Sequence, residues 1–173
     1  MINYKTMAKY DYIIGIDPDC DKSGVAVLST NYTRTIELHS MPFPDLLDYL
    51  KGRKEFVTHF SFLIVVEVGW LNDSHWHVAK RDSPAIAAAK GNAVGRNHET
   101  GRKIVEMCKH YGLTYVEQRP LRKCWSGKEG KITHSELSQF IAGFPSKSNQ
   151  ETRDAALLAW NWAGFPIRMK MKL

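Results

Sequence analysis

The stretch YIIGIDPDCDKSGVAVLS, residues 12–29, contains two apolar runs joined by a polar turn rich in aspartate. Apolar runs of this length on either side of such a turn predict a β-hairpin with buried strands. A single carboxylate, Asp17, ends the first run, and a buried charge is costly unless it is paired, hydrated or bound to a metal. Asp17 is therefore either a turn residue before Pro18 or a ligand at the end of a strand.

The whole chain predicts an α/β fold with the element order βββαβαβαα. Strands are expected at residues 12–17, 25–28, 35–39, 61–70 and 113–118, and helices at 42–54, 84–111, 133–142 and 151–163. Gly52 is expected to stop the first helix, and Ala155, Leu158 and Trp162 are expected to face the core from the last one. Antiparallel strands followed by strands that alternate with helices predict a mixed five-stranded sheet flanked by helices.

The composition predicts one globular domain over residues 1–173, because 43% of the residues are hydrophobic and 24% are charged. No apolar run approaches the ~18 residues of a membrane-spanning helix, and residues 1–11 lack the apolar core of a signal peptide. The three cysteines, at positions 20, 108 and 124, form no CxxC pair. This argues against a disulfide framework or a structural zinc site, and a cytoplasmic protein without membrane contact is expected.

Positive charge is concentrated in one part of the chain, whose formal net charge is +6. Residues 101–131 contain eight lysines and arginines against three glutamates, and Arg168, Lys170 and Lys172 follow near the end. Such a zone is typical of a protein that binds a polyanion. Charge alone is equally compatible with a solvated basic face.

Glu67 repeats the arrangement of Asp17, since it ends the apolar run 62–66. If the two strands lie side by side, both acids emerge at one edge of the sheet, where ligands of α/β proteins collect. The last helix adds Glu151 and Asp154, which are three residues apart and so share one face. Each acid alone is compatible with a structural or solvated role. Together the four predict a site for Mg²⁺ or Mn²⁺, which prefer hard oxygen ligands.

Three motifs in this order resemble the RuvC family of Holliday-junction resolvases, which have a ribonuclease H-like fold. GIDP at residues 15–18, VVEVGW at 65–70 and ETRDAALLAW at 151–160 are similar to the family's three acidic motifs. The resemblance implies that Asp17, Glu67, Glu151 and Asp154 are the catalytic residues and hold two Mg²⁺ or Mn²⁺ ions. It also implies an endonuclease that cleaves four-way or other branched DNA and leaves 5′-phosphate and 3′-hydroxyl ends.

The resemblance extends to residues that would contact DNA or a second subunit. Trp70, three residues after Glu67, matches an aromatic residue that reaches the bases of the junction, although ordinary packing is the alternative role. RPLRKCWSGKEGK, residues 119–131, is similar to the family's phosphate-binding segment. It provides Arg119, Arg122, Lys123, Lys128 and Lys131, among which Lys123 and Lys131 are the closest equivalents. Residues 90–96, KGNAVGR, resemble a helix that forms a homodimer interface.

The turn after Asp17 departs from the family pattern, because Asp19 stands where a glycine is usual and Cys20 and Asp21 follow it. The altered turn keeps open a second class of function, a DNA-binding recombination-accessory protein with little or no catalysis. An actin-like phosphotransferase is a third class, but it requires two such domains and a phosphate loop rich in glycine and threonine. His75 and His77 are expected to face solvent or to contact phosphates.

Overall fold

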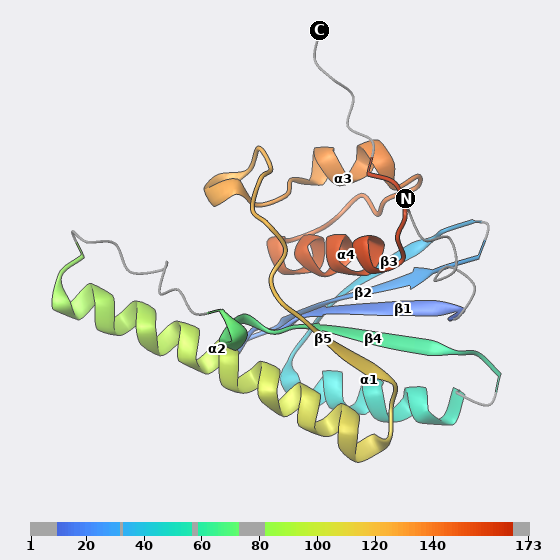
Figure 1. Cartoon of the computed structure of the whole chain (residues 1–173), viewed down its shortest axis with the longest axis horizontal. Helices are drawn as coiled ribbons and strands as arrows, with labels where there is room; N and C mark the ends of the chain where they lie inside the picture. Colours follow the sequence, from blue (N-terminus) through green and yellow to red (C-terminus); the bar gives the residue numbers. More distant parts are fainter. Residues whose placement is uncertain (1–9, 32, 57–58, 73–81, 168–173) are drawn as a thin grey trace, which may run out of the picture.

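The computed structural model describes residues 10–31, 33–56, 59–72 and 82–167, and its centre is a five-stranded sheet (Figure 1). The strands are β1 (Tyr12–Asp17), β2 (Ser23–Ser29), β3 (Ile36–Met41), β4 (Phe62–Glu67) and β5 (Tyr115–Gln118). Their spatial order is β3-β2-β1-β4-β5. β2 pairs antiparallel with β1 and β3, whereas β4 pairs parallel with β1 and β5. The predicted fold class, a mixed five-stranded sheet of the ribonuclease H-like kind, is confirmed.

Helices cover both faces of this sheet, as Figure 1 shows. α1 (Phe43–Phe56) and α2 (Pro84–Tyr111) lie on one face, and α3 (His134–Phe140) and α4 (Gln150–Trp162) lie on the other. Successive residues of a strand point to opposite faces, so Ile13 joins the core under α4 while Ile14 joins the core over α1 and α2. The continuous apolar runs in the sequence follow from this burial on both sides.

Most helix ends lie where the sequence predicts them. Ser83 caps the start of α2 and Gly112 ends it in the left-handed conformation, with φ of 67°. The prediction for Gly52 was wrong, because α1 continues to Phe56 through a position where a side chain would meet nothing within 4 Å. In α4, Ala155 and Leu158 are fully buried as expected, whereas Trp162 is only partly buried.

α4 lies directly on the sheet at two glycines. A Cβ atom on Gly15 would be 2.2 Å from the carbonyl oxygen of Ala155, and one on Gly24 would be 2.1 Å from that of Glu151. Both distances are far below van der Waals contact. These two glycines therefore let the helix backbone approach β1 and β2 closely, next to the strand end that carries Asp17.

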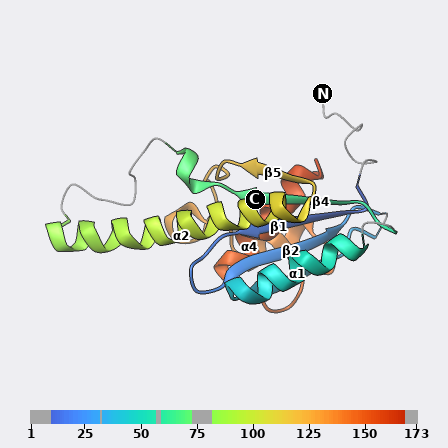
Figure 2. The same cartoon turned by 90° about the horizontal axis from the view of Figure 1, so that it is seen from below.

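The first half of α2 extends beyond the edge of the sheet (Figure 2). The buried residues of this helix, Gly101, Ile104 and Cys108, all belong to its second half, whereas Ile86 is exposed. Among the described residues, no helix has the combination of length and apolar character that crossing a membrane requires. The three cysteines are unpaired, as the sequence predicts.

Candidate metal centre

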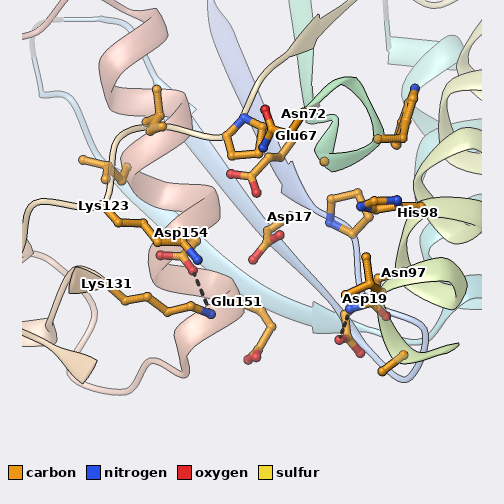
Figure 3. A pocket seen from close by; sticks show the side chains of 18 of the residues that line it. Asp17, Asp19, Glu67, Asn72, Asn97, His98, Lys123, Lys131, Glu151 and Asp154 are labelled. Carbon is orange, nitrogen blue, oxygen red and sulfur yellow. Dashed lines mark hydrogen bonds and ion pairs between the residues drawn. The ribbon is translucent and has the colours of Figure 1, made fainter. Parts of the chain in front are cut away.

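Two of the predicted acids lie next to each other at one edge of the sheet. β1 and β4 are parallel neighbours with Ile16 opposite Val66, so Asp17 and Glu67 occupy the next position on each strand. Figure 3 shows both carboxylates at the same end of the sheet. The sequence argument required these two strands to be adjacent, and the structure confirms that they are.

α4 brings the other two acids to the same place. Asn149 and Thr152 form a capping box that begins the helix, and Glu151 and Asp154 lie in its first turns. Asp154 is turned toward Asp17 in Figure 3, whereas the carboxylate of Glu151 is turned away from the other three. All four acids line one cleft of about 570 Å³, which we call the acidic cleft.

Burial and mutual repulsion raise the pKa of three of these carboxylates. The pKa of Asp17 lies well above its ordinary value, first because of burial and then because of the charges of Glu67 and Asp154. Burial and Asp154 raise the pKa of Glu67 to about 7. Burial also raises the pKa of Asp154, although Lys131 opposes this shift. A group of buried acids that disfavour one another's charge is a donor set suited to divalent cations.

This electrostatic arrangement predicts how the stability of the metal-free protein depends on pH. Between pH 4.5 and 7 the folded protein binds more protons at Glu67 than the unfolded chain does. The free energy of unfolding should therefore fall by about 3 kcal/mol as the pH rises through this window, and the loss is complete above it. Urea titrations in EDTA between pH 5 and pH 8 measure the effect.

Glu67→Gln should remove much of this dependence, because the amide does not titrate. Asp48, an exposed acid on α1, provides the matched control, and Asp48→Asn should leave the pH dependence as it is. An equal fall in stability for Glu67→Gln and the wild type would contradict the raised pKa of Glu67.

One wall of the acidic cleft is the basic loop, residues 119–131. The partly buried Lys131 places its Nζ 3.8 Å from the Asp154 carboxylate, and Lys123 also lowers the pKa of Glu67. Glu136 holds the loop, since its carboxylate accepts hydrogen bonds from the backbone nitrogens of Ser126 and Thr133 at 2.9 Å each. Of the residues expected to bind DNA, Arg122, Lys123 and Lys131 line the cleft. Arg119 and Lys128 are exposed and do not line it.

Trp70 follows β4 in a short 3-10 helix, Gly69–Leu71, and its ring both packs and lines the cleft. A Cβ atom on Gly101 of α2 would be 2.5 Å from the indole, so the ring lies directly on that helix. The guanidinium of Arg102 lies over the ring, 5.5 Å from its centre. The packing alternative for Trp70 is therefore visible, while its place in the cleft keeps the ring beside the acids.

The opposite wall of the acidic cleft is α2, which the sequence analysis did not connect with the site. Lys90, Val94, Asn97 and His98 line the cleft from this helix, followed by Arg102. Their spacing of three to four residues places them along one helical face. That periodicity was readable in the sequence, but it does not show which part of the molecule the face meets. His75 and His77 lie outside the described residues.

The chain is similar to three solved structures of Holliday-junction resolvases. Thermus thermophilus RuvC in complex with a Holliday junction substrate shares 13% identity, covering 86% of this chain and 89% of that chain, with a TM-score of 0.44. Another Thermus thermophilus RuvC structure shares 15% identity over 86% and 90%, with a TM-score of 0.41. The yeast mitochondrial Holliday junction resolvase Ydc2 shares 12% identity over 92% and 82%, with a TM-score of 0.41. The sequence matches no family model and no curated protein.

Proposed function

We propose that this chain is a metal-dependent endonuclease that cleaves branched DNA, with four-way junctions as its preferred substrate. The observation that carries the proposal is the acidic cleft, where strand-end acids on adjacent parallel strands meet Asp154 of α4 between two basic walls. A carboxylate cluster would repel a phosphodiester by itself. Bound cations would reverse that repulsion at the centre, and the basic walls favour the approach of a polyanion.

The residues of the cleft have distinct roles in this proposal. Asp17, Glu67 and Asp154 would hold Mg²⁺ or Mn²⁺ ions, two for each site, and Glu151 would complete the set after its side chain turns inward. When bound, such ions lower the pKa of an attacking water and stabilise the leaving 3′ oxygen, which gives 5′-phosphate and 3′-hydroxyl ends. Lys123 and Lys131 would hold the phosphate beside the acids.

We further propose that the chain acts as a homodimer, which would place two such clefts on the two strands of a junction. The exposed first half of α2, which includes residues 90–96, supports this assignment because few of its side chains are covered within the chain. Light scattering of the purified protein at several concentrations measures the oligomeric state.

Cleavage assays with end-labelled four-way, flap and linear duplex DNA, each with Mg²⁺ or EDTA, test the proposed function. Cleavage of the four-way substrate that requires Mg²⁺ and gives religatable nicks is expected. Absence of cleavage on all three substrates would overturn the proposal. If binding to branched DNA persisted without cleavage, the accessory-protein alternative, which the acidic turn at Asp19 and Asp21 favours, would replace it.

The basic loop provides a prediction about affinity. Replacing Lys123 and Lys131 together by alanine should weaken binding to all DNA sequences alike and should reduce the salt dependence by up to about two phosphate contacts. The matched control replaces Lys51 and Lys54, which are exposed on α1. If both double variants bind DNA with the same salt dependence, the loop is only a solvated basic surface.

Trp70 provides a prediction about branch recognition. Trp70→Ala should reduce junction cleavage by about tenfold to a hundredfold, because stacking on an unpaired base is worth roughly 1–3 kcal/mol. Binding to linear duplex, which offers no unpaired base, should change little. Because the ring packs on Gly101, thermal melting must accompany the assay. A large loss of stability with equal losses on junction and duplex would assign Trp70 a packing role alone.

A further inference from the structure

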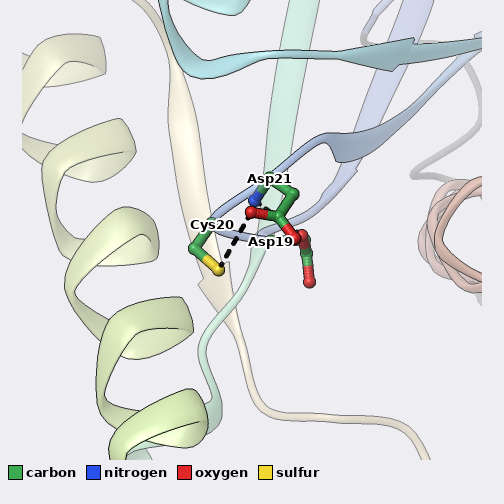
Figure 4. Close-up of side chains that lie close together, drawn as sticks. All are labelled: Asp19, Cys20 and Asp21. Atoms are coloured by element: carbon green, nitrogen blue, oxygen red, sulfur yellow. Dashed lines mark hydrogen bonds between the residues drawn. The ribbon is translucent and has the colours of Figure 1, made fainter.

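The turn between β1 and β2 gathers Asp19, Cys20 and Asp21, whose candidate ligand atoms lie within 4.8 Å of one another (Figure 4). The carboxylate of Asp19 already has partners within the protein. Its Oδ1 accepts hydrogen bonds from the backbone nitrogens of Asp21 at 2.8 Å and Lys22 at 3.3 Å. Its Oδ2 accepts a hydrogen bond from the side chain of Asn97 at 3.1 Å. The cluster is thus explained by the structure of the turn, without an additional ion.

Asn97 is bonded to this turn through both ends of its side-chain amide. Its Nδ2 donates to Asp19, and its Oδ1 accepts from the backbone nitrogen of Cys20 at 3.0 Å. Asn97 belongs to α2 and lies 77 residues or more from both partners in the sequence. Figure 3 shows it beside Asp19 at the margin of the acidic cleft. We call this pair of hydrogen bonds the Asn97 bridge.

The far side of the same turn is fixed to the acids. The hydroxyl of Ser23, which is fully buried, accepts from the backbone nitrogen of Asp19 at 3.2 Å and donates to its carbonyl oxygen at 3.3 Å. The next residue, Gly24, is the partner of Asp17 in the sheet and touches the backbone of Glu151. The turn therefore connects α2 to the strand and the helix that carry the acids.

Apolar packing holds only the second half of α2, from Gly101 onward. Asn97 lies just before that point, in the part of the helix that forms a wall of the cleft. Polar contacts must therefore set the distance between this wall and the acids. Two hydrogen bonds from one amide, one of them to a carboxylate, are well suited to this task.

We propose that Asn97 is a positioning residue, and that the Asn97 bridge fixes the α2 wall relative to Asp17 so that a DNA strand in the cleft lies correctly on the acids. The inference rests on the proposed function. Asn97 would act through the turn and not on the reacting phosphate. Loss of the bridge should then lower kcat while DNA affinity remains, since a displacement of about 1 Å can reduce a rate by a hundredfold.

An exchange of the two side chains tests this role. Asn97→Asp places a second carboxylate against Asp19 and should lower kcat for junction cleavage by about tenfold to a hundredfold. In the double variant Asp19→Asn/Asn97→Asp, the amide at position 19 again donates to the carboxylate at position 97. That carboxylate still accepts from the Cys20 nitrogen, so most of the lost kcat should return. Asn161→Asp, at an exposed site at the opposite end of α4 from the acids, is the control for added charge.

Hydrogen exchange of the chain without DNA or metal provides a second measurement. The Cys20 amide and the amides of residues 90–100 should exchange faster in Asn97→Ala and at the wild-type rate in the side-chain exchange variant. If the wild type cleaves DNA and Asn97→Asp retains its kcat, or the double variant restores nothing, the positioning role is wrong. If the wild type cleaves no DNA, the proposed function fails, and unchanged exchange in Asn97→Ala would separately show that the bridge does not hold α2.

Discussion

Asp17→Asn should reduce Mg²⁺-dependent cleavage of branched DNA by about a thousandfold or more, which corresponds to a loss of about 4 kcal/mol of transition-state stabilisation. The same change should make the metal-free protein more stable at pH 8. The pKa of Asp17 is raised by burial and by two neighbouring acids, so its charged form destabilises the fold, whereas the asparagine has almost the same shape and no charge. Opposite effects on activity and stability are typical of residues at functional sites.

Cleavage rates, junction affinity in EDTA and thermal melting of the same preparation measure these effects. Asp48→Asn changes an exposed acid on α1 and should alter none of the three. Wild-type cleavage by Asp17→Asn with Mg²⁺ as the only metal would remove Asp17 from the site. A marked loss of stability would show instead that Asp17 is a structural turn residue before Pro18.

The position of Asp17 and Glu67 could be predicted from the sequence because it depends on local patterns. Each acid ends an apolar run, and the alternation of strands and helices made adjacent parallel strands the simplest arrangement. The long helix 84–111 and its end at Gly112 were also readable, since a cap and a left-handed glycine are local features. Local signals therefore predicted most of the sheet and the acids at its edge.

The walls of the cleft depend on distant contacts and were predicted only in part. The family resemblance indicated the basic loop, but nothing local shows that Arg122 reaches the cleft while Arg119 does not. The Asn97 bridge joins residues more than 70 positions apart, and the sequence shows Asp19 only as an unusual acid in a turn. Gly52 was misread because a glycine stops a helix only where the surrounding structure favours the stop, and α1 continues through it.

Gly24→Ala should destabilise the protein by about 3 kcal/mol, which is a large effect for the addition of one methyl group. The new Cβ atom would be 2.1 Å from the carbonyl oxygen of Glu151 and 2.7 Å from the backbone nitrogen of Thr152. Both atoms belong to the backbone of the first turn of α4, so no side chain can rotate to make room. The helix must move away from β2, and Glu151 and Asp154 must move with it.

Cleavage should therefore fall by about a hundredfold even at temperatures where the variant is fully folded, because the acids of α4 are displaced from Asp17. Gly52→Ala is the matched control. It adds the same methyl group inside α1, where nothing lies within 4 Å, and should stabilise the protein by about 0.5–1 kcal/mol without a change in cleavage. Urea titrations and single-turnover cleavage of both variants separate the two effects. A folded Gly24→Ala variant with normal cleavage would show that the distance between α4 and β2 does not set the geometry of the acids.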